Sequence, residues 1–566
     1  MQPRQSTQRL RQWAVLFAAT LCCSPALAQQ RPPDAGTILK EVTPTPAPTK
    51  PAAPPLPKPE APAAPAFAAP TVSFVLKDVR FNGNTVISSD VLAQLAADRI
   101  GKSVTLADLN EVAGRITSRY REQGYFLAQA LIPRQEIKDG VVEVSILEGR
   151  LGKLRINRAP DAPISDKRLA GVMQAVQPGQ PLRQAPLERA MLILSDTPGI
   201  EVQSSLEEGE QPGTTDLIVE VNPYKRVAFS LDADNYGIRS SGEYRLGASL
   251  RAASPLEYGD NLDLRAMTSS GGGITFGRVG YEIPVGTHGV RVGAGLARLE
   301  YALGEEFSAL GATGNALVAD ASLSYPIIRS RAQNVFGKVS YEHKRLQDDV
   351  TQVDSHVGKL VRNWGAGVIY EARDRFWGGG YSSASATVYA GNLDIDDPLT
   401  LAADQSAGGL HTQGGFTKLA YQLSRLQSVS ARGSVFLGLT GQWASKNLDS
   451  AEKIVLGGPR AVRAYPNSEA VADEGQIVTL EYRYSVSPDW TVTGFYDAGW
   501  AKVNHDPLPG EPENYRSLRG YGLGMYWGLA GEIAVQASLA WRQTGPARSD
   551  TKDRDPRLYV QAIKMF

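Results

Sequence analysis

The sequence predicts an α+β region followed by an all-β region: two tandem β-α-α-β-β modules and then a transmembrane antiparallel β-barrel of about 16 strands. Three observations predict this fold. The same order of strands and helices occurs twice between residues 71 and 223. From residue 224 onward helical periodicity disappears and apolar residues alternate with polar ones in runs of about ten. The chain also begins with the pattern of an export signal.

Composition excludes several classes of protein. The 566 residues carry 59 Lys+Arg and 59 Asp+Glu, so the basic excess of a nucleic-acid-binding protein is missing. The sequence has no P-loop motif, and its five histidines are scattered without the spacing of a zinc site. It also has no window of about 18 apolar residues, which argues against a helical membrane protein. We therefore expect no nucleic-acid partner, no metal, no cofactor and no catalytic residues.

Residues 1–28 are predicted to be a signal peptide. Three arginines precede an apolar stretch over residues 13–23, and Ala26-Leu27-Ala28 is a suitable cleavage site. An N-terminal anchor is the alternative, but the apolar stretch is short for a bilayer span. Both cysteines, Cys22 and Cys23, lie in this segment, so the mature chain is expected to have neither a disulfide nor a thiolate metal site.

Residues 29–70 are predicted to be a Pro/Ala-rich tether. They hold thirteen of the 36 prolines, a composition that cannot form a packed core. Residues 34–42 differ, because they follow Pro32-Pro33 and Asp34 is a suitable N-cap. The sequence is compatible with either a short helix or a disordered segment at residues 34–42.

Residues 71–151 are predicted to form the first module. Its second helix begins at Thr105, with Asp108 completing a capping box. Apolar residues then recur on one helix face: Leu109, Val112, Ala113, Ile116 and Tyr120. The other expected elements are strands over 72–81, 126–132 and 141–147 and a helix over 89–98.

Residues 152–223 repeat this order. Ser165 caps the first helix, and Leu187, Ala190 and Leu194 lie on one face of the second. Pro198-Gly199 ends that helix. The expected strands cover residues 154–156, 200–206 and 216–221.

Residues 224–566 are predicted to form the barrel. A large soluble β-sandwich also alternates, but here the inward faces carry charges that a packed core would not hold unpaired. These inward residues include Glu481, Arg483, Asp497 and Arg542. Membrane strands need about 9–11 residues plus turns, so about 16 strands fit the length, with 14 or 18 as alternatives. A barrel of this size is wide enough for a channel.

A long loop interrupts the barrel at about residues 444–474. Loops of this length are usually functional or disordered. This one contains Leu-Gly-Gly-Pro-Arg-Ala-Val-Arg-Ala-Tyr-Pro at 456–466. The strand after the next turn holds Phe495, Asp497 and Gly499, and its alternation places Asp497 on the inner wall.

Together these features resemble the TpsB transporters of two-partner secretion, the haemolysin secretion/activation and filamentous-haemagglutinin transporter family of the ShlB/FhaC/HecB type. The two modules are similar to polypeptide-transport-associated (POTRA) domains. Tyr-Arg-Glu-Gln-Gly-Tyr at 120–125, Ala-Leu-Ile-Pro at 130–133 and Ile-Leu-Glu-Gly at 146–149 match the first, and residues 187–199 match the second. The resemblance covers essentially the whole mature chain.

The resemblance implies that the long loop folds back into the barrel lumen. Val462, Arg463 and Tyr465 match the family's VRGY motif, whereas Ala464 stands where the family has glycine. An alanine would be strained there if the position needs a positive φ. Residues implied for the lumen wall are Phe495, Asp497 and Gly499, from the superfamily's F-x-D-x-G motif, together with Glu481 and Arg483.

An ion pair between Arg463 and Asp497 is expected, since the arginine fork can bind a carboxylate through two hydrogen bonds. Its role as a breakable latch or as a structural contact is open. Family members also carry a plug helix. Residues 34–42 would rise only about 13 Å as a helix, so this segment is not expected to fill a membrane-thick lumen by itself.

The resemblance implies an outer-membrane translocator that recognises an unfolded exoprotein through periplasmic POTRA domains and exports it without ATP. Implied partners are a haemolysin- or adhesin-like exoprotein, outer-membrane lipid and periplasmic chaperones. An assembly factor that inserts other barrels is the alternative. A passive porin would lack residues 71–223, and a barrel lipase would need a nucleophile and histidine that the sequence does not bring together.

Overall fold

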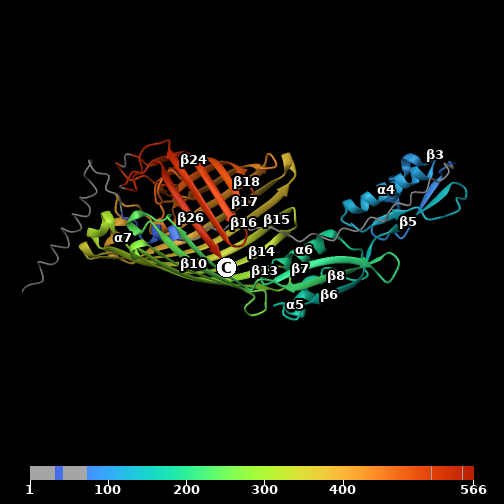
Figure 1. The fold of residues 1–566 in the computed structure, drawn as a ribbon, viewed down its shortest axis with the longest axis horizontal. Coiled ribbons are helices and arrows are strands. Elements are labelled where there is room, and N and C mark those ends of the chain that lie inside the picture. The colour runs from blue at the N-terminus through green and yellow to red at the C-terminus, as the bar shows by residue number, and fades with distance from the viewer. Residues whose placement is uncertain (1–31, 43–72, 511–512, 551) are drawn as a thin grey trace, which may run out of the picture.

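The computed structural model describes residues 32–42, 73–510, 513–550 and 552–566. In these ranges the chain forms two small α+β modules and one large β-barrel (Figure 1). The expected signal peptide and nearly all of the tether lie outside the described residues. Within those ranges, no helix has the length and apolar character needed to cross a membrane.

The first module is built on a three-stranded sheet of order β2-β5-β4, in which β2 and β5 are parallel. Thr105 and Asp108 form the expected reciprocal capping box at the start of α4. The strand expected over 72–81 is split in two, because β1 pairs with β3 and leaves the main sheet to β2. The elements are β1 (Phe74–Val75), β2 (Asp78–Asn82), α3 (Ser89–Gln94), the 3₁₀ helix η1 (Ala97–Arg99), β3 (Ser103–Val104), α4 (Leu106–Glu122), β4 (Gln129–Leu131) and β5 (Val141–Leu147).

The second module repeats the β-α-α-β-β order. Its sheet has the order β6-β8-β7, with β6 parallel to β8. The strand expected over 126–132 shortens to β4 because Phe126 and Leu127 turn away and pack against the core of this second module. The elements are β6 (Arg150–Arg158), α5 (Asp166–Met173), α6 (Gln184–Ser195), β7 (Ile200–Glu208) and β8 (Thr214–Pro223).

The barrel is a closed antiparallel sheet of sixteen strands, as predicted, and β26 pairs with β9 to close it. Its strands are β9 (Val227–Asp234), β10 (Arg245–Ala253), β11 (Asn261–Ser269), β12 (Ile274–Val285), β13 (Val290–Ala302), β14 (Ala312–Arg329), β15 (Gln333–Val350), β16 (Ser355–Asp374), β17 (Gly380–Ile395), β18 (Gly414–Ser428), β19 (Gly433–Ala444), β22 (Glu474–Ser485), β23 (Trp490–Lys502), β24 (Tyr515–Leu529), β25 (Ile533–Arg542) and β26 (Arg557–Met565).

Side chains alternate between the two faces of the barrel wall. On β23, Trp490, Val492 and Trp500 are exposed on the outer face, whereas Phe495 and Asp497 are buried on the inner face. An apolar outer face with charged residues on the inner face is the pattern of a membrane barrel with a polar lumen.

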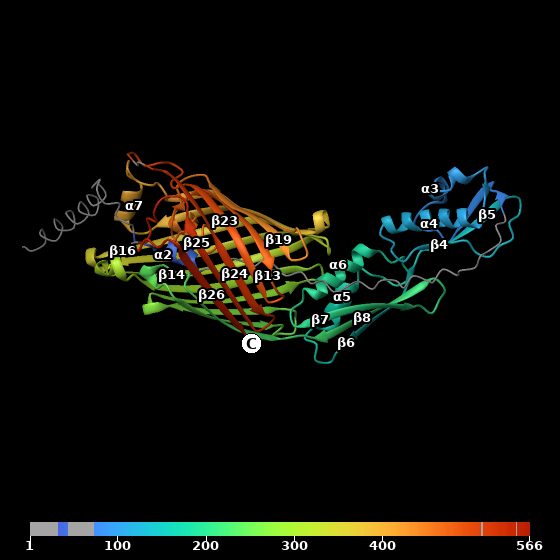
Figure 2. The same ribbon diagram turned by 45° about the horizontal axis from the view of Figure 1, so that its top comes forward.

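The second module docks on the turns at one end of the barrel, here called the module end (Figure 2). Arg189 of α6 donates to the carbonyl oxygens of Pro326 (2.7 Å), near the end of β14, and His288 (3.3 Å), in the turn between β12 and β13. Arg329 donates two hydrogen bonds of 2.7 and 2.8 Å to Asp196. These contacts fix the second module beside the mouth of the barrel.

Candidate functional site

The long loop between β19 and β22, residues 445–473, folds into the lumen. These bounds agree with the expected loop at about residues 444–474, since β19 ends at Ala444 and β22 begins at Glu474. It contains the 3₁₀ helix η7 (Ser450–Glu452) and a small hairpin of β20 (Ile454–Val455) and β21 (Val471–Ala472). Val462 and Tyr465 are buried in a cluster with inward-facing residues of the wall, including Phe495 and Leu518.

Arg463 connects this loop to two carboxylates on the wall. Its Nε donates to Asp497 Oδ2 and its Nη2 to Asp497 Oδ1, both at 2.8 Å, and its Nη1 donates to Glu481 Oε1 at 2.7 Å. Burial alone would lower the pKa of Arg463, but the hydrogen bonds to Asp497 raise it above its ordinary value. The guanidinium is therefore fixed in its charged form.

Aromatic rings support these charges. The guanidinium carbon of Arg463 lies 3.4 Å from the centroid of the Phe495 ring. Arg483 donates to Glu481 Oε2 at 2.8 Å and lies over the ring of Phe436 at 4.5 Å. A cation over an aromatic face is stabilised most where water is excluded.

Close packing also requires two glycines in the wall. A Cβ at Gly499 would lie 3.2 Å from side-chain atoms of Leu456 and Val462. A Cβ at Gly520 would lie 2.4 Å from the Ala464 methyl group. Ala464 is not among the non-glycine residues with a positive φ, so alanine bears no left-handed strain at this position.

Tyr465 binds the loop to the neighbouring part of the wall, at β26 and the loop between β25 and β26. Its hydroxyl hydrogen-bonds Thr544, and its carbonyl accepts a 2.9 Å bond from the hydroxyl of Tyr559 on β26. Arg542 lies over its ring at 5.9 Å.

A second segment, α2 (Ala35–Val42), also lies inside the barrel (Figure 2). Of the alternatives open from the sequence, the helix is observed. Asp34 caps it by accepting from the backbone N–H of Thr37 at 3.0 Å. Ile38 and Leu39 are buried in one hydrophobic cluster with inward-facing wall residues such as Leu299 and Phe416. The helix therefore occupies the lumen, although it is short.

Polar contacts hold both ends of α2. At its start, the Ser450 hydroxyl donates to Asp34 at 2.5 Å, and Asp348 accepts from the N–H of Ala35 at 2.7 Å. At its end, Glu41 accepts from the N–H of Ile238 at 3.1 Å and lies 3.7 Å from Arg245. Burial raises the pKa of Glu41 to about 7, against the opposing effect of Arg245.

Residues 449–452 of the long loop join α2 to the wall. Asp449 binds Lys359 at 2.9 Å, and Lys359 also lies 3.6 Å from Asp34. Glu452 binds Lys344 at 3.0 Å and Lys418 at 2.7 Å. Burial alone would raise the pKa of Glu452, but these two lysines hold it far below the ordinary range.

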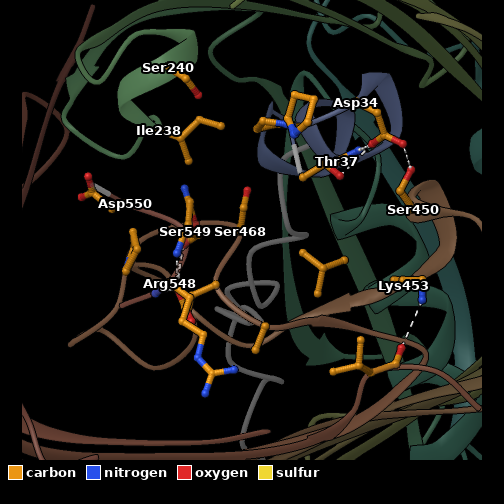
Figure 3. A pocket seen from close by; sticks show the side chains of 18 of the residues that line it. Asp34, Thr37, Ile238, Ser240, Ser450, Lys453, Ser468, Arg548, Ser549 and Asp550 are labelled. Atoms are coloured by element: carbon orange, nitrogen blue, oxygen red, sulfur yellow. Dashed lines mark hydrogen bonds between the residues drawn. The ribbon is translucent and has the colours of Figure 1, made fainter. Parts of the chain in front are cut away.

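A cavity of about 810 Å³ lies beside α2 (Figure 3). Asp34 and Thr37 of α2 line one side of it, with Ser450 and Lys453 from the long loop. Across the cavity lie Ser549 and residues near it in the loop between β25 and β26. The lumen thus contains α2, the long loop and this remaining space.

The structure brings most of the sequence-predicted site residues together. Arg463, Phe495, Asp497, Glu481 and Arg483 form one contact network, with Val462 and Gly499 packed beside it and Tyr465 in the same buried cluster. Glu481 as a direct partner of Arg463 was not anticipated. The lysine contacts of Asp449 and Glu452 were missed too. A signal existed, since lysines at inward positions of adjacent strands indicate acidic partners in the lumen.

Comparisons with known proteins agree with this architecture. Residues 74–149 match the model of the ShlB-type POTRA domain, and residues 213–527 match that of the haemolysin secretion/activation protein ShlB/FhaC/HecB. Heme/hemopexin transporter protein HuxB of Haemophilus influenzae is 28% identical over 508 residues, 88% of each chain. Outer membrane transporter CdiB of Dickeya dadantii is 22% identical over 410 residues, 71% of each chain.

Solved structures share the fold. CdiB from Escherichia coli matches with a TM-score of 0.70 at 18% identity, over 100% of this chain and 99% of that one. BamA from Haemophilus ducreyi lacking POTRA domains 1–3 matches with a TM-score of 0.51 at 14% identity, over 87% and 100%. The family match covers more than half of this chain, which therefore belongs to the ShlB/FhaC/HecB family of haemolysin secretion/activation proteins, the TpsB outer-membrane transporters.

Proposed function

We propose that this protein exports one unfolded exoprotein through its own barrel, and that α2 and the long loop occupy the export path at rest. The POTRA domain, and with it the module end, faces the periplasm, so the far end is extracellular. Residues 152–223 are proposed to be a second POTRA domain, because they repeat the element order of the first. No catalytic step is part of this proposal.

One observation carries it: α2 is attached to the barrel by side chains and not by a backbone ladder. Ser450, Asp348, Lys359 and Arg245 hold its ends through hydrogen bonds and ion pairs. Hydrogen bonds and ion pairs of this kind can break while the sixteen-stranded wall stays closed. Without α2 and the long loop, the lumen has the width at which large barrels form channels.

The energy for export is proposed to come from the exoprotein. The sequence has no P-loop, and chain folding outside the cell would make passage one-way. The modules could receive the unfolded chain by β-augmentation, since an edge strand offers unpaired backbone groups to any extended segment. β7 lies at the edge of its sheet and is nine residues long, which suits this role.

The cargo is proposed to be a haemolysin-like, adhesin-like or heme-acquisition exoprotein. The names of relatives support the haemolysin and heme classes, since one is a heme/hemopexin transporter and another the hemolysin transporter protein HpmB of Proteus mirabilis. Periplasmic chaperones are proposed to keep the cargo unfolded before it reaches the modules.

The test is co-expression of this chain with the protein of the neighbouring reading frame, whose secretion is assayed in the culture medium. We expect secretion with the wild-type chain and its loss when residues 73–223 are deleted, with the barrel still in the outer membrane. A porin control of equal size should secrete nothing. Secretion that persists without this chain, together with depletion of other barrels from the membrane, would overturn the proposal in favour of an assembly factor.

A further inference from the structure

The outer face of the barrel carries an apolar groove across β10–β13. Its volume is about 510 Å³. Ala248, Ala266 and Gly277 are direct cross-strand partners and form its floor. The next row of partners forms a ridge along it: Leu250, Leu264, Val279 and Leu296.

This groove faces the membrane and not the lumen. Arg265 and Arg278, next to the floor residues on β11 and β12, point inward, where they bind Asp232 and Asp320. Their neighbours Ala266 and Gly277 must then point outward. A Cβ at Gly277 would meet no atom within 4 Å, so the floor is open there.

The floor ends at an arginine. Gly277 pairs with Arg298 on β13, and the same row continues through Leu317 to Arg345 on β15. Arg298 points outward, because its neighbours Ala297 and Leu299 are buried against the lumen cluster. Its side chain is 69% exposed, and its Nε and Nη2 both lie against Glu300 Oε1, which leaves Nη1 available.

Arg345 is the second cation of the row. Lys344 and Leu346 on either side of it face the lumen, where Lys344 binds Glu452, so Arg345 faces outward. It is exposed and makes no hydrogen bond or ion pair with any residue in the described ranges. Strands lie about 4.8 Å apart, so Arg298 and Arg345 are separated by about 10 Å across Leu317.

The row rises toward the extracellular side. Ala248 stands five residues from the periplasmic end of β10, whereas Arg345 stands twelve residues from the periplasmic end of β15. About 9–11 residues cross the hydrocarbon layer, so the floor lies within it and the arginines lie at its outer boundary. An exposed Trp364, 4.8 Å from Tyr341 between ring centroids, lies just below, as aromatic residues do at this boundary.

We propose that this wall binds a phosphorylated lipid of the outer leaflet, with an acyl chain in the groove and phosphate on Arg298 and Arg345. The membrane excludes proteins and water from the groove, and the boundary position brings lipid headgroups to the arginines. Arginine suits phosphate because its planar fork donates two parallel hydrogen bonds. Glu300 competes with the phosphate for Arg298.

The purified full-length chain in detergent would be titrated with lipid A, a phosphorylated and acylated glycolipid, and bound lipid counted by native mass spectrometry. Arg298→Gln combined with Arg345→Gln should weaken binding about tenfold or more, since hydrogen bonds to charged groups are the strong ones. Glu300→Gln should strengthen it. Arg519, an exposed arginine on β24 beside Trp500 (5.9 Å), supplies the matched control Arg519→Gln, which should change nothing.

Gly277→Leu tests the groove without touching a charge, because the new side chain enters open space and fills the floor. It should reduce lipid A binding several-fold and leave secretion competence of the barrel intact. Equal losses in the Arg519 control would overturn the proposal, as only a general headgroup contact would remain. Displacement of lipid A by millimolar inorganic phosphate, with Gly277→Leu behaving as wild type, would also overturn it in favour of a free anion site.

Discussion

Arg463 and Asp497 share two hydrogen bonds of 2.8 Å inside the barrel, one from Nε and one from Nη2. Asp497 is fully buried and Arg463 nearly so. The remaining guanidinium nitrogen is used by Glu481. The long loop is thus fixed at its centre by one cation between two carboxylates.

Arg463→Ala should detach the long loop from the barrel wall. It leaves Asp497 and Glu481 as buried charges without their partner, and breaking such a pair typically costs about 3–5 kcal/mol. We expect faster proteolysis within residues 445–473 and reduced secretion. Arg483→Ala is the matched control, since Arg483 is 36% exposed and pairs with one carboxylate, Glu481, so a loss of about 1 kcal/mol or less is expected. Equal effects of the two variants would contradict the central place of Arg463.

Gly520→Ala should displace the tip of the loop. Its Cβ would lie 2.4 Å from the Ala464 methyl group, and overpacking of this kind costs about 1–3 kcal/mol. Adding Ala464→Gly should restore much of the loss, as measured by loop proteolysis in the two single variants and the double variant. Additive losses in the double variant would show that the two residues do not meet.

Closure of the pore by α2 should depend on pH through Glu41. Burial raises its pKa to about 7 from an ordinary 4.5, so the protonated form favours the docked helix. This stabilisation is complete below about pH 4.5 and is lost as pH rises to about 7. In planar bilayers, channel openings should be rarer at pH 5.5 than at pH 8.

Glu41→Gln keeps the side chain neutral and should abolish this pH dependence. Arg245, Asp234 and Tyr559 surround Glu41, and Asp234→Asn serves as the control for an altered charge nearby. An unchanged pH dependence in Glu41→Gln would assign the titration to another group.

Glu452→Ala should loosen both α2 and the long loop. It leaves Lys344 and Lys418 without their buried carboxylate partner, close to Lys40 of α2, whose pKa burial already lowers. Bilayer recordings should show more frequent openings at an unchanged fold of the barrel. Glu532→Ala, which removes an exposed carboxylate 3.9 Å from Lys564, should behave as wild type.

Strict alternation predicted the barrel and the inward position of Asp497, because it determines which side chains of a strand face inward. The placement of Arg463 opposite Asp497 came from the family resemblance, which implies that the long loop folds into the lumen. The ends of the individual strands could not be predicted as well. The sequence pattern predicted that Phe126 and Leu127 belong to a strand, but they pack against the core of the second module and are not part of β4. The docking of α2 could not be predicted either. A short helix gains its stability from burial, and the wall residues that bury Ile38 are distant in sequence.

The most direct test of the account is to fix α2 in the lumen during export. Asp34 and Lys359 face each other at 3.6 Å, so Asp34→Cys with Lys359→Cys can be joined by a short bismaleimide. The account predicts that the cross-linked protein secretes no exoprotein, while each single-cysteine variant treated alike still does. Undiminished secretion by the fully cross-linked protein would show that α2 does not occupy the export path.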